Sequence, residues 1–317
     1  MIHSAGRVRA LLRRLAYGAV WGVAAVWSAP VAGQSAEAPA VSAEDASDAG
    51  AVPDDAVQRG AYVFRAAGCY SCHTDTKGGG APLAGGRALE TPFGTFYSPN
   101  ITPHPVYGIG AWSDEDFQAA LRHGVSPDGD PYYPSFPYTS YTGMSDGDIA
   151  DLQAYLFAQE PAETQNKPHD LNFPYNLRFT LGLWKTMFFE AGAYQEDAQQ
   201  DAAWNRGAYL TRHLGHCGEC HSPRGFLGAV DDSLELAGNP KGPDGGRVPN
   251  LTPAEGGLAG WSESDIASAL KIGITPEGDF LSDSMGEVIE HGTSHLSDED
   301  LTAIAIYLKS LQPISGP

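Results

Sequence analysis

The apolar positions of the chain follow a helical period in two segments that lie about 150 residues apart. In the C-terminal segment, apolar residues recur at three- and four-residue spacing and share one helix face: Leu301, Ile304, Ala305, Leu308 and Leu311. Ile149, Leu152 and Leu156 show the same spacing in the earlier segment. No segment alternates apolar and polar residues convincingly, as a half-buried strand does. The pattern therefore predicts an all-α fold.

The two helical segments belong to a longer internal repeat. The sequence RGAY at 59–62 returns at 206–209, and PNITP at 99–103 returns as PNLTP at 249–253. Ser113 and Ser262 each precede an acid by three residues, which is the capping-box pattern of a helix start. A unit this long that occurs only twice is not a solenoid. We therefore predict two tandem domains of one kind, over residues 55–161 and 201–317.

The first 54 residues are expected to lie outside these domains. Four arginines precede a short apolar run at 15–27 and small residues up to 33, which predicts a secretory signal peptide over residues 1–33. The run is shorter than the ~20 residues of a spanning helix, although an uncleaved anchor is the alternative. Residues 34–54 consist mainly of Ala, Ser, Pro and acids, and we predict a disordered tether there. The protein is expected in the periplasm, either soluble or membrane-associated.

The segment between the predicted domains, residues 162–200, is unusually aromatic. It contains Phe173, Phe179, Trp184, Phe188 and Phe189. A solvated hinge does not need such side chains, so we expect this apolar linker to pack across both domains. The alternative is a docking patch for a partner.

The charge of the chain limits its partners. There are 39 acidic and 19 basic side chains, for a formal charge of -20. Nucleic-acid binding needs a basic surface, so we expect no nucleic-acid partner. The acidic surplus serves mainly as a solvated surface, and its faces near the functional groups are expected to bias the docking of partners.

All four cysteines fall into two motifs of the form CxxCH, at 69–73 and 217–221. A disulfide framework, a zinc site or a thioredoxin-like pair leaves the histidine that follows each pair unexplained. CxxCH is the attachment signal of c-type haem. We therefore predict two covalently bound haem c groups, with thioether bonds to Cys69, Cys72, Cys217 and Cys220. His73 and His221 are the expected proximal iron ligands.

The sixth iron ligand is better defined in the second domain than in the first. A thioether suits an electron carrier because it stabilises ferrous iron. Met285 falls in the predicted loop before the last helix, where a distal ligand is expected. Met144 is the candidate in the first domain, but it lies eight residues past the equivalent position, which Phe136 occupies. His104, His123 or an open site are the alternatives there.

Other residues near the motifs are candidates for supporting roles. A backbone carbonyl near Pro82 or Pro223 is expected to accept the ring N–H of the proximal histidine. The repeated PN(I/L)TP motif offers either donors to haem propionates or plain turn formers. Its candidate residues are Asn100, Thr102, Asn250 and Thr252.

The sequence resembles the diheme c-type cytochromes related to the cytochrome subunits of bacterial alcohol, aldehyde and gluconate dehydrogenases. The resemblance rests on three stretches: SPNITP…GIGAWSDEDF, LNFPYNLRFTLGLWKTMFFEAG and WNRGAYLTRHLGHCGECHSP. It implies two class I cytochrome c-like domains and the ligands proposed above. The dehydrogenase subunits usually carry three CxxCH motifs, whereas this chain has two.

The resemblance also implies a function and partners. We expect single electrons to pass from a periplasmic or membrane-associated dehydrogenase to a downstream cytochrome, a quinone-pool complex or a terminal oxidase. The alternative is a diheme redox enzyme such as a peroxidase. A thiosulfate-oxidising cytochrome needs a cysteine as distal ligand, and all four cysteines are already used.

Overall fold

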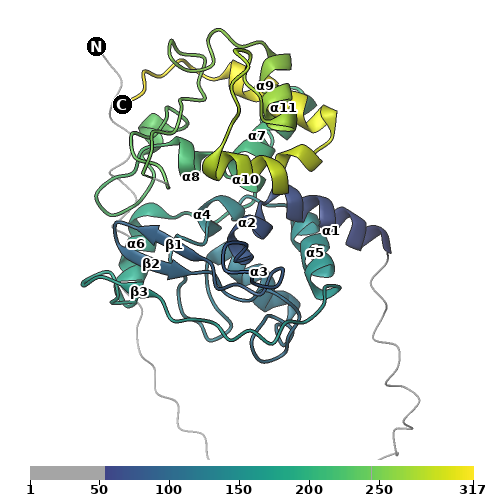
Figure 1. The fold of residues 1–317 in the computed structure, drawn as a ribbon, viewed down its shortest axis with the longest axis vertical. Coiled ribbons are helices and arrows are strands. Elements are labelled where there is room, and N and C mark those ends of the chain that lie inside the picture. Colours follow the sequence, from purple (N-terminus) through teal and green to yellow (C-terminus); the bar gives the residue numbers. More distant parts are fainter. Residues whose placement is uncertain (1–53, 244) are drawn as a thin grey trace, which may run out of the picture. The chain divides into compact units, whose positions relative to one another are not determined.

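Two crossing helices frame each repeat in the computed structural model, which describes residues 54–243 and 245–317. In the first repeat, α1 (Asp54–Ala66) packs against α5 (Asp146–Phe157). In the second repeat, α7 (Ala202–Tyr209) packs against α11 (Asp298–Ser310), and Figure 1 shows both pairs. The predicted signal peptide and the predicted tether, apart from its last residue, lie outside the described residues.

A glycine makes each of these crossings possible. A Cβ atom on Gly60 would lie 1.8 Å from the carbonyl oxygen of Asp151, and one on Gly207 would lie 1.9 Å from that of Ala303. Real Cβ atoms do not come so close to a backbone oxygen, so only glycine allows the helices to approach this far. This contact explains why the glycine of RGAY occurs in both repeats.

Further helices of 3 to 10 residues complete the fold. In chain order they are α2 (Cys69–His73), α3 (Asp114–His123), α4 (Tyr138–Tyr141), α6 (Thr180–Phe188), the π-helix η1 (Leu210–Leu214), α8 (Gly218–His221), the 3-10 helix η2 (Asp232–Leu234), α9 (Glu263–Ile272), α10 (Asp283–His291) and the 3-10 helix η3 (Thr293–His295). The capping boxes predicted at Ser113 and Ser262 are confirmed, with Asp116 and Asp265 as their acids.

The expectation of an all-α fold is wrong in one respect, because two strands of the first repeat and one of the linker form a small antiparallel sheet. Its strands are β1 (Ala88–Thr91), β2 (Gly94–Tyr97) and β3 (Asp170–Leu171), in the order β1-β2-β3. Strands of two to four residues are too short to show an alternating pattern in the sequence. Phe96 of β2 is buried with Tyr133 and Leu181, so the sheet positions helix α6.

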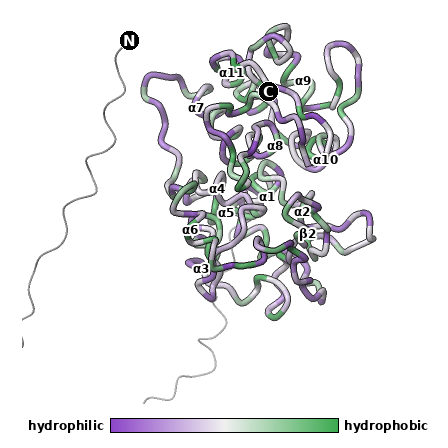
Figure 2. Tube along the Cα trace, turned by 90° about the vertical axis from the view of Figure 1, so that its left-hand side faces the viewer, coloured by the Kyte–Doolittle hydropathy of each residue, from purple (hydrophilic) through white to green (hydrophobic). Residues whose placement is uncertain are grey.

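The two repeats share one hydrophobic core. A single cluster of buried residues includes Phe64 and Leu152 of the first repeat and Leu210, Leu301 and Tyr307 of the second. The described residues accordingly form one compact unit. Hydrophobic segments occur in both halves of this unit (Figure 2). The exact domain boundaries stay a prediction.

The aromatic linker does not pack as expected. Phe173 and Phe179 are 78% and 80% exposed, and Phe188 of α6 is 43% exposed. On α6, Leu181 is buried against the sheet, whereas Leu183 and Met187 are 64% and 52% exposed. The linker therefore presents much of its apolar surface to solvent.

The described helices are all too short or too polar to span a lipid bilayer.

Candidate functional site

Both CxxCH motifs lie on short helices that follow the first framing helix of each repeat. Cys69 to His73 form α2, and α8 begins directly after Cys217. All four cysteines are thiols and none forms a disulfide. Burial raises the pKa of Cys69 and of Cys217 to about 12, so both stay protonated at neutral pH. The disulfide framework considered from the sequence is therefore absent.

The two motif histidines are held in the same way. His73 Nδ1 lies 2.8 Å from the carbonyl oxygen of Pro99, and His221 Nδ1 lies 2.8 Å from that of Pro249. Burial lowers the pKa of both imidazoles, which favours the neutral ring. A neutral ring that donates from Nδ1 leaves Nε2 as a lone-pair donor for a metal.

The acceptor carbonyls are not those expected near Pro82 and Pro223. They belong instead to the first residue of each PN(I/L)TP motif, of which only the Asn and Thr residues are candidates from the sequence. The repetition of this motif 26 residues after His73 and 28 residues after His221 was the available signal. The general expectation of a backbone carbonyl as acceptor is confirmed.

The side chains of the PN(I/L)TP motifs are already fully engaged in the protein. Asn100 Oδ1 accepts hydrogen bonds from the amide and hydroxyl of Thr102, and its Nδ2 donates to the carbonyl oxygen of Ala162 at 2.8 Å. Asn250 binds Thr252 and the carbonyl oxygen of Ile314 in the same way. These buried residues therefore tie the segment after each last helix to the motif, which favours the turn-forming role over a propionate contact.

The loop after each motif contains a leucine in an unusual backbone conformation. Leu83 and Leu236 both have φ of +60°, although this region disfavours side chains larger than glycine. The glycine two residues after each leucine donates its amide to the carbonyl oxygen of the motif histidine. The distance is 2.9 Å from Gly85 to His73 and 2.8 Å from Gly238 to His221. This loop was not expected from the sequence, although Leu-Ala-Gly occurs in both repeats.

The methionines differ in their surroundings. Met285 is half-buried in the first turn of α10, so the expectation of a loop at this position is wrong. Met144 is fully buried, and its carbonyl oxygen accepts a hydrogen bond from Arg122 Nη1 at 2.6 Å. Its thioether is therefore already enclosed by protein atoms. Met187 is exposed on α6 and is not a candidate iron ligand.

The alternative histidine ligands of the first repeat have other positions. His104 Nδ1 accepts hydrogen bonds from the amides of Val106 and Tyr107, so it stabilises a local turn. His123 is exposed at the C-terminal end of α3.

Each motif packs against the segment that precedes the last helix of the other repeat. The ring of Tyr70 in the first motif contacts that of His291 in α10 in a tilted arrangement, with centroids 4.5 Å apart, and Arg87 pairs with Glu287 of α10 at 2.6 Å. Conversely, Glu219 of the second motif accepts hydrogen bonds from Thr139 at 2.9 Å and from Ser140 at 3.1 Å. The surroundings of each motif therefore include residues of the other repeat.

One histidine links the two motifs directly. His216 precedes Cys217, and its ring lies 5.4 Å from that of Tyr141. Tyr141 donates a hydrogen bond to the carbonyl oxygen of Ala67 at 2.6 Å, and His216 also hydrogen-bonds to the backbone of Ala67, two residues before Cys69. Contacts among His216, Tyr141 and Ala67 thus connect the residue before Cys217 with the backbone just before Cys69.

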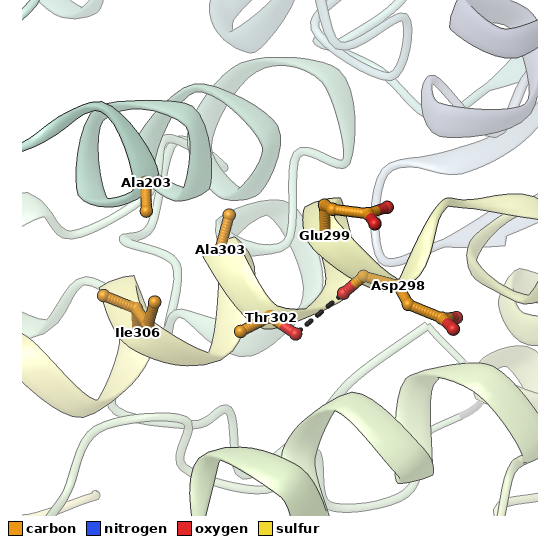
Figure 3. Close-up of a pocket in the computed structure, with 6 residues that line it drawn as sticks. All are labelled: Ala203, Asp298, Glu299, Thr302, Ala303 and Ile306. Carbon is orange, nitrogen blue, oxygen red and sulfur yellow. Dashed lines mark hydrogen bonds between the residues drawn. The ribbon is translucent and has the colours of Figure 1, made fainter.

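A surface pocket between two helices is not part of this arrangement. It lies between α7 and α11 and is lined by Ala203, Asp298, Glu299, Thr302, Ala303 and Ile306 (Figure 3). Thr302 donates its hydroxyl to the carbonyl oxygen of Asp298 at 2.7 Å. The pocket contains no cysteine, histidine or methionine, so it offers no redox chemistry.

The residues at each motif fit covalent haem c. Two thiols flank a turn, one imidazole nitrogen is available, and the hydroxyl of Ser71 inside the first motif is buried without a hydrogen-bond partner in the described residues. No group of three or more His, Cys, Asp or Glu side chains suited to a metal occurs within residues 54–243 and 245–317. The donor set is thus that of a haem rather than that of a zinc site.

Comparisons with known proteins agree with this donor set. The sequence model of the family described as Cytochrome c matches residues 57–159. A protein of Cereibacter sphaeroides named "Diheme cytochrome c-type" is 47% identical over 261 residues, which cover 81% of this chain and 86% of that protein.

Subunits of three dehydrogenases are also similar. The fructose dehydrogenase cytochrome subunit of Gluconobacter japonicus is 41% identical, and the gluconate 2-dehydrogenase cytochrome c subunit of Pantoea cypripedii is 42% identical. An alcohol dehydrogenase (quinone) cytochrome c subunit of Gluconobacter oxydans is 39% identical. The chain spans only 52% to 60% of the length of these three relatives. With two CxxCH helices held alike and a diheme relative matched over most of its length, the chain belongs to the diheme c-type cytochromes.

Proposed function

We propose that this protein is an exported electron carrier that holds two haem c groups and passes single electrons from a dehydrogenase toward the respiratory chain. The observation that carries the proposal is the equivalent treatment of both motif histidines, whose Nδ1 atoms both bind a proline carbonyl at 2.8 Å. The similarity to cytochrome subunits of fructose, gluconate and alcohol dehydrogenases supports a dehydrogenase as donor. A downstream cytochrome, a quinone-pool complex or a terminal oxidase is the acceptor.

In this proposal each residue has a defined task. Cys69, Cys72, Cys217 and Cys220 would form the thioether bonds to haem. His73 and His221, oriented by Pro99 and Pro249, would ligate the two irons on one side, and Met144 and Met285 would ligate them on the other. The haem iron supplies a reversible one-electron couple when bound. The polypeptide excludes water, orients the imidazoles and fixes the distance between the two motifs.

The location also forms part of the proposal. The basic and apolar pattern of residues 1–33 supports export to the periplasm, where haem is attached to CxxCH motifs.

The test is a haem assay followed by substrate-driven reduction. Purified protein should contain two covalent haems per chain, and a Cys217→Ala/Cys220→Ala variant should contain one. Membranes of the source bacterium should reduce the cytochrome when fructose, gluconate or an alcohol is added, and a deletion strain should lose this reduction until the gene is restored. A haem content other than two, or rapid turnover of peroxide by the purified protein, would contradict the proposal.

A further inference from the structure

One apolar surface of the protein remains open to solvent, and it lies on helix α6. Phe179, Leu183 and Met187 follow one another at four-residue spacing, so they share one face of the helix. They are 80%, 64% and 52% exposed. Phe226, in the loop after the second motif, is 86% exposed. We refer to these four residues as the α6 patch.

The α6 patch draws on both repeats. Trp184 of α6 donates its indole N–H to the carbonyl oxygen of Leu227 at 2.9 Å, which joins the helix to the loop that carries Phe226. In the same region the ring of Phe93, in the β1–β2 turn, lies close to Gly228. The helix and the loop are therefore held together before any partner binds, which lowers the entropy lost on binding.

The patch is free of acidic groups in a strongly acidic chain. Residues 172–189 and 222–230 contain three basic side chains and no acid, whereas the whole chain carries a charge of -20. All three cations are turned to the protein. Arg178 donates to the carbonyl oxygen of Pro131 at 2.9 Å, Lys185 to that of Gly124 at 3.2 Å, and Arg224 to that of Glu219 at 2.8 Å.

This arrangement distinguishes between possible occupants. Helices that lie on membranes use free lysines and arginines to attract anionic lipids, and here those groups are engaged with carbonyls. A second copy of the chain would bring another charge of -20 close to the first. Aromatic side chains and methionine, with few charges among them, are typical of the centre of a protein–protein interface.

We propose that the α6 patch docks the catalytic subunit of the electron-donating dehydrogenase through a largely uncharged apolar surface on that subunit. This inference rests on the proposed function and specifies where the donor binds. The patch adjoins the second attachment motif, because Arg224 of the Phe226 loop binds Glu219, which lies between Cys217 and Cys220. One electron therefore passes from the donor to the site at the second motif, so that the donor is oxidised and that site is reduced.

The test uses the complete cytochrome with both haems, in the source bacterium. A photo-crosslinking amino acid is placed at Leu183, and at Val106 as a control that is 75% exposed outside the patch. We expect the Leu183 position to form an adduct with a dehydrogenase catalytic subunit, identified by mass spectrometry, and the Val106 position to form none. Adducts between two cytochrome chains, or equal labelling from both positions, would overturn the proposal.

A kinetic measurement accompanies the crosslink. A Phe179→Ser/Leu183→Ser variant should be reduced by substrate at least about tenfold more slowly at limiting cytochrome concentration, since truncation of central aromatic residues typically costs this much affinity. Val106→Ser should leave the rate unchanged. An unchanged rate in the double variant would contradict the proposal, as would loss of sedimentation with phosphatidylglycerol vesicles in that variant alone.

Two controls separate this inference from the proposed function. Haem content and chemical reduction by dithionite are measured in every variant, and both should match the parent protein. If the parent is reduced by substrate but the patch variants are reduced equally fast, only the docking surface is wrong. If the parent itself is never reduced by substrate, the proposed function fails and the docking proposal fails with it.

Discussion

Tyr62 of the first repeat donates its hydroxyl to Asp300 of the second repeat at 2.6 Å, across the contact between the two halves. The same hydroxyl accepts the amide of Ser297, which caps the last helix, at 3.1 Å. Tyr209 is the equivalent residue in the second repeat, and it makes the same pair of contacts with Asp148 and with the amide of Ser145 in the first. Each repeat thus holds the start of the other's last helix.

The first prediction concerns these two tyrosines. Tyr62→Phe should lower the free energy of unfolding by about 1.5–3 kcal/mol, because a hydrogen bond to a charged group is lost and a helix-cap amide loses its acceptor. Tyr209→Phe should have a similar effect, and Tyr97→Phe should have little. Denaturant unfolding followed by circular dichroism measures all three. Equal stability of Tyr62→Phe and Tyr97→Phe would show that the contact contributes nothing.

The second prediction concerns the helix crossings. Gly60→Ala and Gly207→Ala should each cost about 3 kcal/mol or more, because the added methyl groups would meet backbone oxygens at 1.8 and 1.9 Å. Gly147→Ala in α5 is the matched control. Its added Cβ has only the Ser145 hydroxyl near it, at 3.8 Å, and alanine favours the helix by up to about 1 kcal/mol.

These glycine variants are compared by thermal and denaturant unfolding of the protein with both haems attached. A Gly60→Ala protein as stable as the parent would mean that α1 and α5 can separate at no cost.

The third prediction concerns acid stability. Burial raises the pKa of Asp300, but hydrogen bonds from Arg206 and Tyr62 lower it more, so the net pKa lies below its usual value. Such a carboxylate stabilises the fold fully above the unfolded-state pKa of about 4, and this contribution is lost as the pH falls through the folded-state value. Unfolding free energies measured between pH 7 and pH 3 should therefore decrease toward acid.

An Asp300→Asn variant tests this assignment. It should be less stable than the parent at pH 7 and should lose less stability on acidification. Asp128→Asn, at an exposed position, should follow the parent curve. Parallel curves for the parent and Asp300→Asn would assign the acid sensitivity to other groups.

The fourth prediction concerns the distal ligands. Met285→Leu should remove the absorption band of a thioether bound to ferric haem from the second site and lower its potential. Met144→Leu should do the same at the first site, and Met187→Leu should change neither, because Met187 is exposed on α6.

The buried position of Met144 makes its variant especially informative. Leucine conserves volume, so as a core substitution alone it should cost less than about 1.5 kcal/mol and leave the spectrum intact. A variant with an unchanged first-haem spectrum and potential would assign Met144 to the core.

The sequence alone predicted the parts of the structure that depend on local pattern. The CxxCH motifs, the helix caps at Ser113 and Ser262 and the last helix of each repeat required only spacing and residue type. The contacts of Tyr62 and Tyr209 were not predictable, because each tyrosine binds the other repeat and nothing local indicates that. The linker aromatics were expected to be buried, yet Phe179 and its neighbours face solvent because the sheet covers only one side of α6.

The reciprocal tyrosine contacts have a consequence for how the protein assembles. An interface in which each half gives and receives the same contact is the kind that joins two identical chains about a two-fold axis. Here a covalent connection replaces association in solution, so the effective concentration of one half near the other is set by chain length and not by expression level. The pair therefore stays together at any dilution, and each half is free to diverge in sequence without losing its counterpart.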